Sequence, residues 1–345
     1  MDTPMPATAS VTPDTRFATA LSVSGNLLTA LYCIIPVCAA VVVIDMLLLD
    51  QALMRNYLPS SPEQWLIWAV AFDTPHILAS FFSFADKEYY RSYKSRVLKT
   101  LAIVSIAVVL FTLVVPVAAP SALARLLTIL FSAFVITYTM YHVLSQQLGV
   151  ALSMMKIRPG KLYSPFRWCA TLSGTFMYSL AVVDHDLYFV GVRFGAIFEL
   201  LAPAFIAISC VLGHNLAKDS KSAKGTLYLY SNLAMLIVAY AFLELGYGVF
   251  VIAVPRFVHD ITAFYIYSVH DHNRNLQTRH NYIYRTVYFL SPLIVCPVLA
   301  MGLSIALEQS ALFVAPLLIV TLLHYYVEGF IWRGDTLHRR QVAFR

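Results

Sequence analysis

The last long apolar run of the chain, 310–331, contains a histidine and a carboxylate at helical spacing. Within the stretch that reads LLHYYVEGFIWR, His324 and Glu328 lie four residues apart. On a helix both side chains project from one face, about one turn apart. An imidazole and a carboxylate cost free energy inside an apolar segment unless they have a partner, a proton or a metal ion. This pair is therefore the first candidate for chemistry.

Three earlier apolar runs contain similar polar residues, and each histidine among them has a carboxylate or an amide nearby. They are Asp73 with His76, His142 with Gln146, and His259 with Asp260. Metal-bound imidazoles usually donate their second N–H to a carboxylate or carbonyl, which makes these pairings informative. We expect the four segments to converge on one buried metal site. The predicted metal ligands are His76, His142, His259 and His324, and the predicted catalytic, ligating or orienting residues are Asp73, Gln146 and Glu328.

The donor atoms restrict the metal. Nitrogen and oxygen ligands fit iron, copper or zinc. The five cysteines lie in or beside apolar runs and form no CxxC pair, so we interpret them as packing residues. With no cysteine near the histidines, a redox-active iron with O2 as co-substrate is the favoured combination. The alternative is a set of unrelated, hydrogen-bonded polar groups inside the membrane.

The composition predicts an all-α polytopic membrane protein. Of the 345 residues, 59% are hydrophobic and only 12% are charged, whereas a soluble domain has about 25% charged residues. Long unbroken apolar runs span a bilayer only as helices, and the alternating pattern of an outer-membrane barrel is absent. The ten apolar runs are 26–49, 63–85, 97–118, 122–150, 167–183, 193–214, 226–245, 249–271, 284–307 and 310–331.

The basic residues orient these ten predicted spans. Twenty of the 24 lysines and arginines fall in the segments on one side, if both termini are cytoplasmic. The positive-inside rule therefore favours ten spans with cytoplasmic termini. The expected location is a bacterial inner membrane. The net charge of +6 follows from this clustering and does not indicate nucleic-acid binding. Within 226–271 we expect the chain to turn at Gly246 and Gly248, with Pro255 as the rival position.

The expected organisation is a single helical domain with short ends. Residues 1–25 are predicted to be a disordered lead, 26–333 the transmembrane domain, and 334–345 a basic cytoplasmic tail. The expected partners are membrane lipid, a hydrophobic small molecule and an electron donor. At 1.5 Å per helical residue, the predicted ligands lie at similar depths, roughly 10–18 Å above the cytoplasmic boundary. His270 lies about 16 Å from His259 along one helix, so we expect His270 and His272 to be surface residues.

Two other functions compete with a metal-dependent enzyme. Glu199 and Glu244 lie in apolar runs, and an intramembrane carboxylate suits a proton- or ion-coupled transporter. Many carriers have related halves, and no such repeat is present. A haem protein with two axial histidines, such as His76 and His324, is the other alternative. The short Asp184-His185-Asp186 segment is interpreted as a solvated outer turn rather than a metal site.

Four motifs resemble a known family. FDTPHILAS, YHVLSQQLGV, RFVHDITAFY and LLHYYVEGFIWR are similar, in this order, to motifs of the Brp/Blh-type carotene dioxygenases. Those bacterial polytopic membrane proteins cleave β-carotene to retinal and are thought to use histidine-bound iron. The resemblance covers about 50 residues.

The resemblance implies a metal-dependent membrane oxygenase with ligands at the four histidines named above. The chain departs from the family pattern where Ala263 replaces a further histidine, and where Gln146 and Gln147 replace an acid. The resemblance therefore implies the type of chemistry rather than the substrate. The classical HxxxH and HxxHH clusters of membrane desaturases are absent, which argues against an ordinary fatty-acid desaturase.

Overall fold

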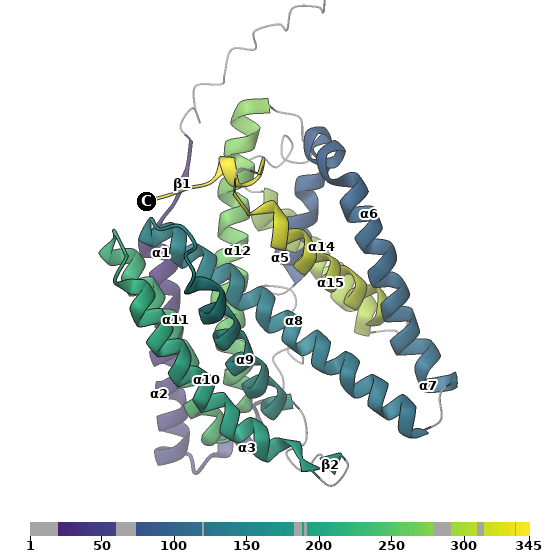
Figure 1. The fold of residues 1–345 in the computed structure, drawn as a ribbon, viewed down its shortest axis with the longest axis vertical. Helices are drawn as coiled ribbons and strands as arrows, with labels where there is room; N and C mark the ends of the chain where they lie inside the picture. The colour runs from purple at the N-terminus through teal and green to yellow at the C-terminus, as the bar shows by residue number, and fades with distance from the viewer. Residues whose placement is uncertain are drawn as a thin grey trace, which may run out of the picture.

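The computed structural model describes residues 20–59, 74–118, 121–182, 188–189, 192–278, 291–308, 314–334 and 336–345. These residues are almost entirely helical, which confirms the all-α fold class (Figure 1). Within the described ranges, six helices are long and apolar enough to cross a membrane, at Gly25–Leu48, Lys87–Val114, Ala122–Met155, Gly195–Ala217, Ala223–Glu244 and Gly248–Arg274. The protein is therefore a helical membrane protein.

Each of the ten predicted apolar runs coincides with a helix wherever it is described. The first half contains α1 (Gly25–Ala30), η2 (Leu31–Cys33), α2 (Ile34–Leu48), α3 (Ala52–Asn56), α5 (Thr74–Phe82), η5 (Ser83–Ala85), α6 (Lys87–Val109), η6 (Leu110–Val114), α7 (Val115–Ala118), α8 (Ser121–Met155) and α9 (Tyr163–Val182). The second half contains α10 (Phe194–Ala217), α11 (Ala223–Glu244), α12 (Gly248–Thr278), α14 (Ser291–Glu308), α15 (Val314–Ile331) and η9 (Arg339–Gln341). The strands are β1 (Ser22–Val23), β2 (Tyr188–Phe189), β3 (Val192–Arg193) and β4 (Ala343–Phe344).

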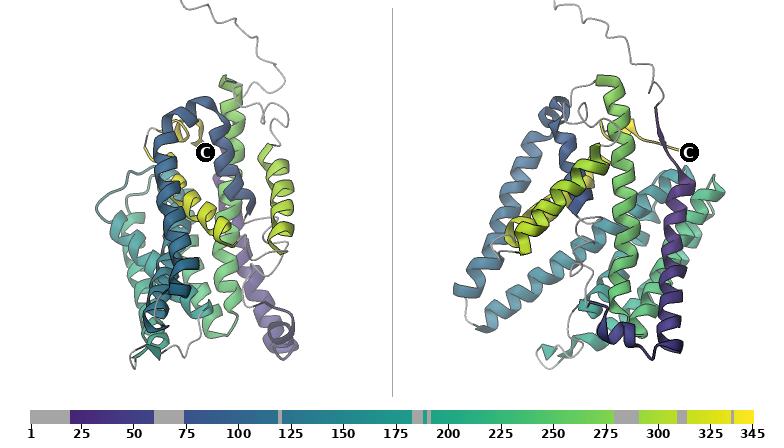
Figure 2. Two further views of the ribbon diagram at one scale, coloured as in Figure 1. Left: turned by 90° about the vertical axis from the view of Figure 1, so that its right-hand side faces the viewer. Right: turned by 180° about the vertical axis from the view of Figure 1, so that it is seen from behind.

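Helix α12 is the centre of the arrangement. It packs against α9 and α11 on one side and against α5 and α14 on the other. The 35-residue helix α8 crosses between the two groups obliquely and contacts α9, α11, α12 and α15 (Figures 1 and 2). At Gly225 the backbones of α11 and α8 nearly touch, because a Cβ there would lie 2.3 Å from the amide nitrogen of Met155. This close contact fixes the end of α8 against α11.

The turn between α11 and α12 lies where the glycines predict it. Helix α11 ends at Glu244, and α12 begins at Gly248. Gly246 has a φ of +85°, a conformation that glycine adopts without steric cost. Pro255 is inside α12 and does not end it. The prediction of a turn at the glycines rather than at Pro255 is confirmed, and it places His259 within one uninterrupted helix.

The two ends of the described chain lie together. Strand β1 pairs in parallel with β4, with Ser22 opposite Ala343. Gly25 also donates its amide hydrogen to the carbonyl of Arg345 across 2.9 Å. The predicted disordered lead, 1–25, lies mostly outside the described residues, and its last residues form this pairing. A chain with an even number of spans has both of its ends on the same side of the bundle.

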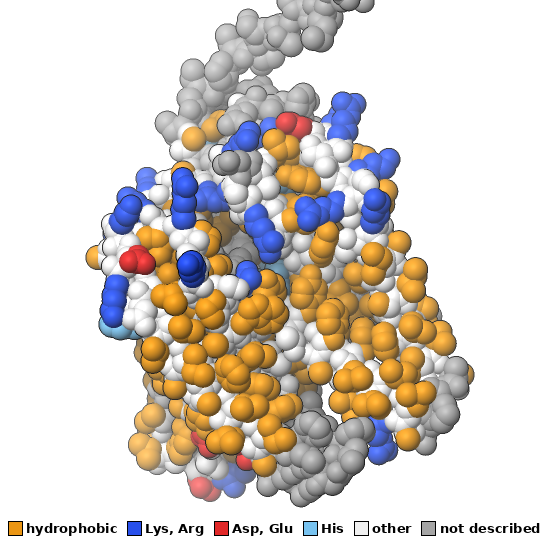
Figure 3. Space-filling model, in the orientation of Figure 1, with side chains coloured by type: hydrophobic (Ala, Val, Ile, Leu, Met, Phe, Trp, Pro, Cys, Tyr) orange, Lys and Arg blue, Asp and Glu red, His pale blue; other side chains and the backbone are white. Residues whose placement is uncertain are grey.

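The surface has the two zones expected of a membrane protein. Large hydrophobic side chains are exposed on the helices, with Leu47 76% and Val117 87% exposed. On the face shown in Figure 3, hydrophobic side chains cover the lower part, and most lysines and arginines gather at the upper end. The charged end is also the end where the chain termini meet (Figure 1).

Candidate metal centre

Four histidines from four helices meet in the interior. His76 comes from α5, His142 from α8, His259 from α12 and His324 from α15. The ring centroids of His76 and His324, of His142 and His259, and of His142 and His324 are each 4.9 Å apart, and those of His76 and His259 are 5.2 Å apart. The four imidazoles therefore form one cluster, although 248 positions separate the first from the last.

The hydrogen bonds of His324 fix which of its nitrogens carries the proton. Its Nδ1 lies 2.9 Å from Oγ of Ser80, and that hydroxyl donates to the carbonyl of Ile77 at 2.7 Å. Because a serine has one hydroxyl proton, Ser80 accepts from Nδ1–H of His324. The Nε2 atom is then an unprotonated lone pair, and among the described residues it has no hydrogen-bond partner. A buried lone pair of this kind suits a metal ligand.

His76 is held by a carboxylate. Its Nδ1 lies 3.2 Å from Oδ1 of Asp260, the neighbour of His259 in α12. A carboxylate behind a histidine fixes its tautomer and makes the opposite nitrogen a better metal ligand. Asp260 also lies close enough to be a ligand itself, since one donor atom each from His76, His259 and Asp260 fall within 4.8 Å of one another. The structure thus brings Asp260 into the cluster.

Glu328 lies between two of the histidines. Its Oε2 is 3.5 Å from Nε2 of His142 and 3.9 Å from Nε2 of His324. Gln146 donates from Nε2 to the same oxygen at 3.0 Å. This hydrogen bond fixes the position of the Glu328 carboxylate. Tyr325 stacks on the His142 ring with centroids 4.3 Å apart and restrains it from the other side.

The side chains of the cluster are buried. The four histidines, Asp260 and Glu328 are each 5% exposed or less. Two carboxylates buried beside neutral imidazoles are costly without compensating positive charge. Buried Arg256, one turn before His259 in α12, supplies one such charge nearby. A divalent cation among the histidines would supply the rest.

The geometry suits a small ion better than a haem. One nitrogen each from His76, His142 and His324 lie within 4.8 Å of one another, so side-chain shifts of about 1 Å or less would bring them to the separations that metal–nitrogen bonds of about 2.1 Å require. Two axial haem ligands must have the porphyrin between them. His76 and His324 instead contact each other edge to face.

No protein-family model, curated protein or solved structure matches the chain. The functional argument therefore depends on the site itself.

Several other polar residues singled out in the sequence lie away from the histidine cluster or outside the described residues. Asp73 and the segment Asp184-His185-Asp186 lie outside the described residues. Glu244 is exposed at the end of α11, and Glu199 is half-buried on α10. Neither belongs to the groups that meet at the histidines. Ser80 was not predicted, although it lies four residues after His76 and thus on the same helix face.

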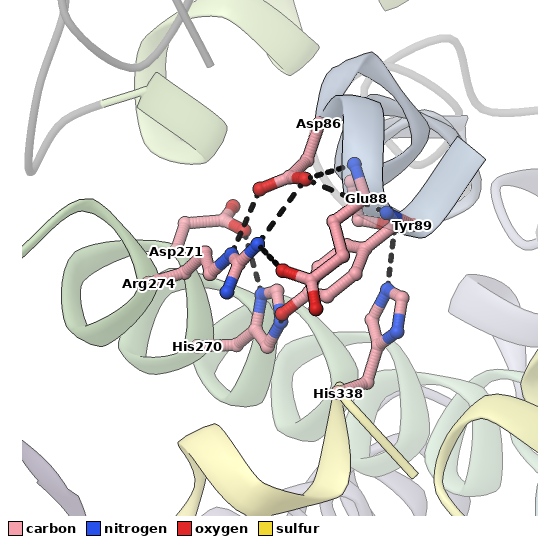
Figure 4. A network of polar contacts seen from close by, with 8 residues as sticks. Asp86, Glu88, Tyr89, His270, Asp271, Arg274 and His338 are labelled. Atoms are coloured by element: carbon pink, nitrogen blue, oxygen red, sulfur yellow. Dashed lines mark hydrogen bonds and ion pairs between the residues drawn. The ribbon is translucent and has the colours of Figure 1, made fainter. Parts of the chain in front are cut away.

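The prediction that His270 and His272 are surface residues is wrong. They are 1% and 6% exposed. The beginning of α6 and the segment after α15 pack over this end of α12 and bury both histidines. Counting residues along α12 alone could not reveal this burial. Nε2 of His270 lies 3.0 Å from the hydroxyl of Tyr89, and Nδ1 lies 2.8 Å from Asp271 (Figure 4). His338 stacks on His270 with centroids 4.9 Å apart.

A buried ion pair joins the same two helices. Nε of Arg274 on α12 donates to Asp86 at 2.8 Å, and Arg274 also pairs with Glu88 (Figure 4). Asp86 additionally caps α6 by accepting from the amide of Glu88 at 2.8 Å. Burial acts to raise the pKa of Asp86. The hydrogen bonds and charge of Arg274 outweigh burial, so the pKa lies below its ordinary 3.8.

We expect Asp86→Asn to lower the thermal unfolding midpoint in detergent clearly. Asn keeps the helix cap but leaves Arg274 without its buried counter-charge, which costs about 3 kcal/mol. Glu88→Gln is the matched control, because the Glu88 side chain is 50% exposed and such pairs contribute little. Since the folded pKa of Asp86 is lowered, its stabilisation is complete above pH 3.8 and is lost as the pH falls below that value. Equal midpoints for the two variants would contradict this account.

Proposed function

We propose that the protein is a membrane-embedded, metal-dependent oxidoreductase that uses O2 on a lipid-soluble substrate. The four histidines would hold the metal, with iron as the first choice and copper or zinc as alternatives with the same donors. The observation that carries this proposal is His324. Its proton is fixed on Nδ1 by Ser80, and its buried Nε2 has no hydrogen-bond partner among the described residues. Its ring contacts those of His76 and His142.

The residues around the histidines have separable roles in this proposal. Ser80 and Asp260 orient His324 and His76. Gln146 positions Glu328 between His142 and His324, where its carboxylate can ligate or accept a proton. Burial of the histidine side chains shields the site from bulk solvent. The metal, when bound, would supply the O2 chemistry, and the protein would supply an apolar pocket and the orientation of the substrate.

A cavity of about 1200 Å³ supports a substrate of considerable size. His142, Gln146 and Glu328 line it, so a molecule inside the cavity would reach the histidine cluster. Sites for drug-sized molecules usually enclose about 300–1,000 Å³. The cavity therefore suits a longer molecule, in agreement with a substrate taken from the lipid phase. An electron donor would complete the expected set of partners.

Metal analysis tests the proposal most directly. Protein purified in neutral detergent should contain about one transition-metal ion per chain, tightly bound and removable by strong chelators. Absorption spectra recorded before and after chelation distinguish haem, which has an intense visible band, from a histidine-bound ion. Purified, folded protein that binds no transition metal, either as isolated or after incubation with iron, copper or zinc, would refute the proposal and favour the transporter alternative.

For topology, we propose ten spans with both termini cytoplasmic, in a bacterial inner membrane. The clustered basic residues and the pairing of β1 with β4 at one end of the bundle support this arrangement.

We expect reporter fusions after Lys221 and after Glu308 to report opposite sides of the membrane, with Lys221 cytoplasmic. Lys221 lies between α10 and α11 in a basic segment, and Glu308 ends α14. A fusion after Lys156, in another basic segment, serves as the control and should agree with Lys221. The same side for Lys221 and Glu308 would invalidate the count of ten.

A further inference from the structure

The cavity next to the histidines differs in character from one end to the other. Its inner end is formed by His142 and Glu328, and tyrosines of α8 and α15 line its wall. Helix α8 runs on for 13 residues from His142 to Met155, which is about 20 Å. Arg158, just beyond that end, also lines the cavity. The cavity therefore extends from the buried cluster to the basic end of the molecule.

Five arginines from separate parts of the chain line this cavity. They are Arg96, Arg158, Arg167, Arg333 and Arg339. Glu328 is the one carboxylate among the described lining residues. None of the five arginines forms an ion pair with a described carboxylate. Figure 3 shows a hollow in this face with lysine and arginine side chains around its upper edge. The outer part of the cavity is thus strongly positive.

Three of these arginines lie over aromatic rings, and Arg339 does so 5.3 Å from the centroid of Phe344. The guanidinium of Arg96 lies 4.4 Å from the Phe330 ring centroid, and its Nε donates to the hydroxyl of Tyr326 at 3.0 Å. The guanidinium of Arg167 lies 4.8 Å from the centroid of Tyr141. The Nε of Arg167 is buried and has no hydrogen-bond partner among the described residues. Stacking restrains these side chains, so less entropy is lost when they bind an anion.

We propose that the cavity binds an amphiphile with an anionic head group and that the arginines hold this head. This inference rests on the proposed function and names the substrate class of the same site. Guanidinium groups bind carboxylates and phosphates through paired, charge-assisted hydrogen bonds. The apolar chain lies along the tyrosine wall of α8 and α15, with its far part directed toward His142 and Glu328. The head group therefore sets which part of the chain reaches the histidines.

Trp332 gives a direct signal for occupancy, because it lines the cavity and bromine quenches tryptophan fluorescence on contact. The probes are three molecules with one dibrominated stearyl chain, carrying a carboxylate, a phosphate or a neutral hydroxyl group. They are titrated into the full chain in neutral detergent. We expect the carboxylate or the phosphate, or both, to quench at concentrations at least 10-fold below the alcohol. The comparison of the two acids shows which head group is preferred.

The variants locate the binding. Arg167→Gln and Arg333→Gln should each weaken binding of the preferred acid about 10-fold. Arg125→Gln is the matched control, because Arg125 is an exposed arginine near the start of α8 that does not line the cavity. Trp332→Phe should remove the quenching that depends on the head group, since Trp168, the other tryptophan in the described part of the chain, does not line the cavity. Equal binding of the alcohol, equal loss in Arg125→Gln, or quenching that depends on the head group and survives Trp332→Phe would overturn the inference.

Metal content separates this inference from the proposed function. The arginine variants should keep their metal, and the brominated acid should still quench Trp332 in His324→Ala. Quenching by the acids in a protein that binds no metal would refute the proposed function alone. A metal-loaded protein that does not discriminate between acid and alcohol would refute this inference alone.

Discussion

His324→Ala should empty the metal site. The substitution removes a lone pair that no other side chain can supply, because Ser80 fixes the proton of His324 on the opposite nitrogen. Losing a group that only supports a ligand costs about 10- to 100-fold in metal affinity, so losing a ligand should cost at least about 100-fold. Metal per chain after gel filtration measures the effect directly. His324→Gln, which keeps a hydrogen-bond donor for Ser80, should lose metal with less disturbance of packing.

Two histidine variants serve as controls for this result. His270→Ala removes a buried histidine of α12 that bonds Tyr89 and Asp271 instead of the cluster. His214→Ala removes an exposed histidine whose partner is Tyr230. Both should retain the metal. Full metal content in His324→Ala and His324→Gln would end the metal-site interpretation. Loss of metal in His270→Ala alone would instead place the site at His270 and the stacked His338.

Glu328→Gln should lower metal affinity or activity by about 10- to 100-fold while the protein still folds. Glutamine keeps the size of the side chain and removes the charge that a cation beside His142 and His324 would need. Gln146, which donates to Glu328, can still bond the amide oxygen of the new side chain. Metal content and thermal stability should be measured on the same preparations.

The interpretation of the cluster as structural polar groups makes the opposite prediction. A neutral amide is easier to bury than a carboxylate, so stability of Glu328→Gln should then hold or rise with nothing else changed. Unchanged metal content and activity would remove Glu328 from the site. Gln146→Leu offers a milder comparison, because it leaves the charge of Glu328 but removes its orienting bond.

The helices and the meeting of the four histidines were predictable from the sequence for a physical reason. Apolar runs in a bilayer must be helical, and basic segments give each run a direction. The position of a residue along its run then gives its depth in the membrane. These depths placed His76, His142, His259 and His324 in one layer. The choice between Gly246 and Pro255 was also decidable, because only glycine adopts a positive φ without cost.

Contacts made across helices were not predictable in the same way. The depth of a residue in the membrane does not reveal how its helix is rotated about its own axis. The sequence therefore did not show that Ser80 faces His324 or that Asp260 faces His76. The burial of His270 depends on Tyr89 and on residues that follow α15, far away in sequence. The arginine-lined cavity likewise combines side chains from segments that the sequence presents only as orienting charges.

The spread of the histidines along the chain sets an order of assembly. A ribosome adding about 5–20 residues per second takes roughly 12–50 seconds to pass from His76 to His324. Until α15 enters the membrane, the cluster lacks both His324 and Glu328, and the nascent chain offers an ion at most an incomplete set of ligands. Under the proposed function, an ion bound at the four histidines would therefore be acquired after translation. Chains truncated before α15 should be synthesised without ever becoming loaded, whichever metal the growth medium contains.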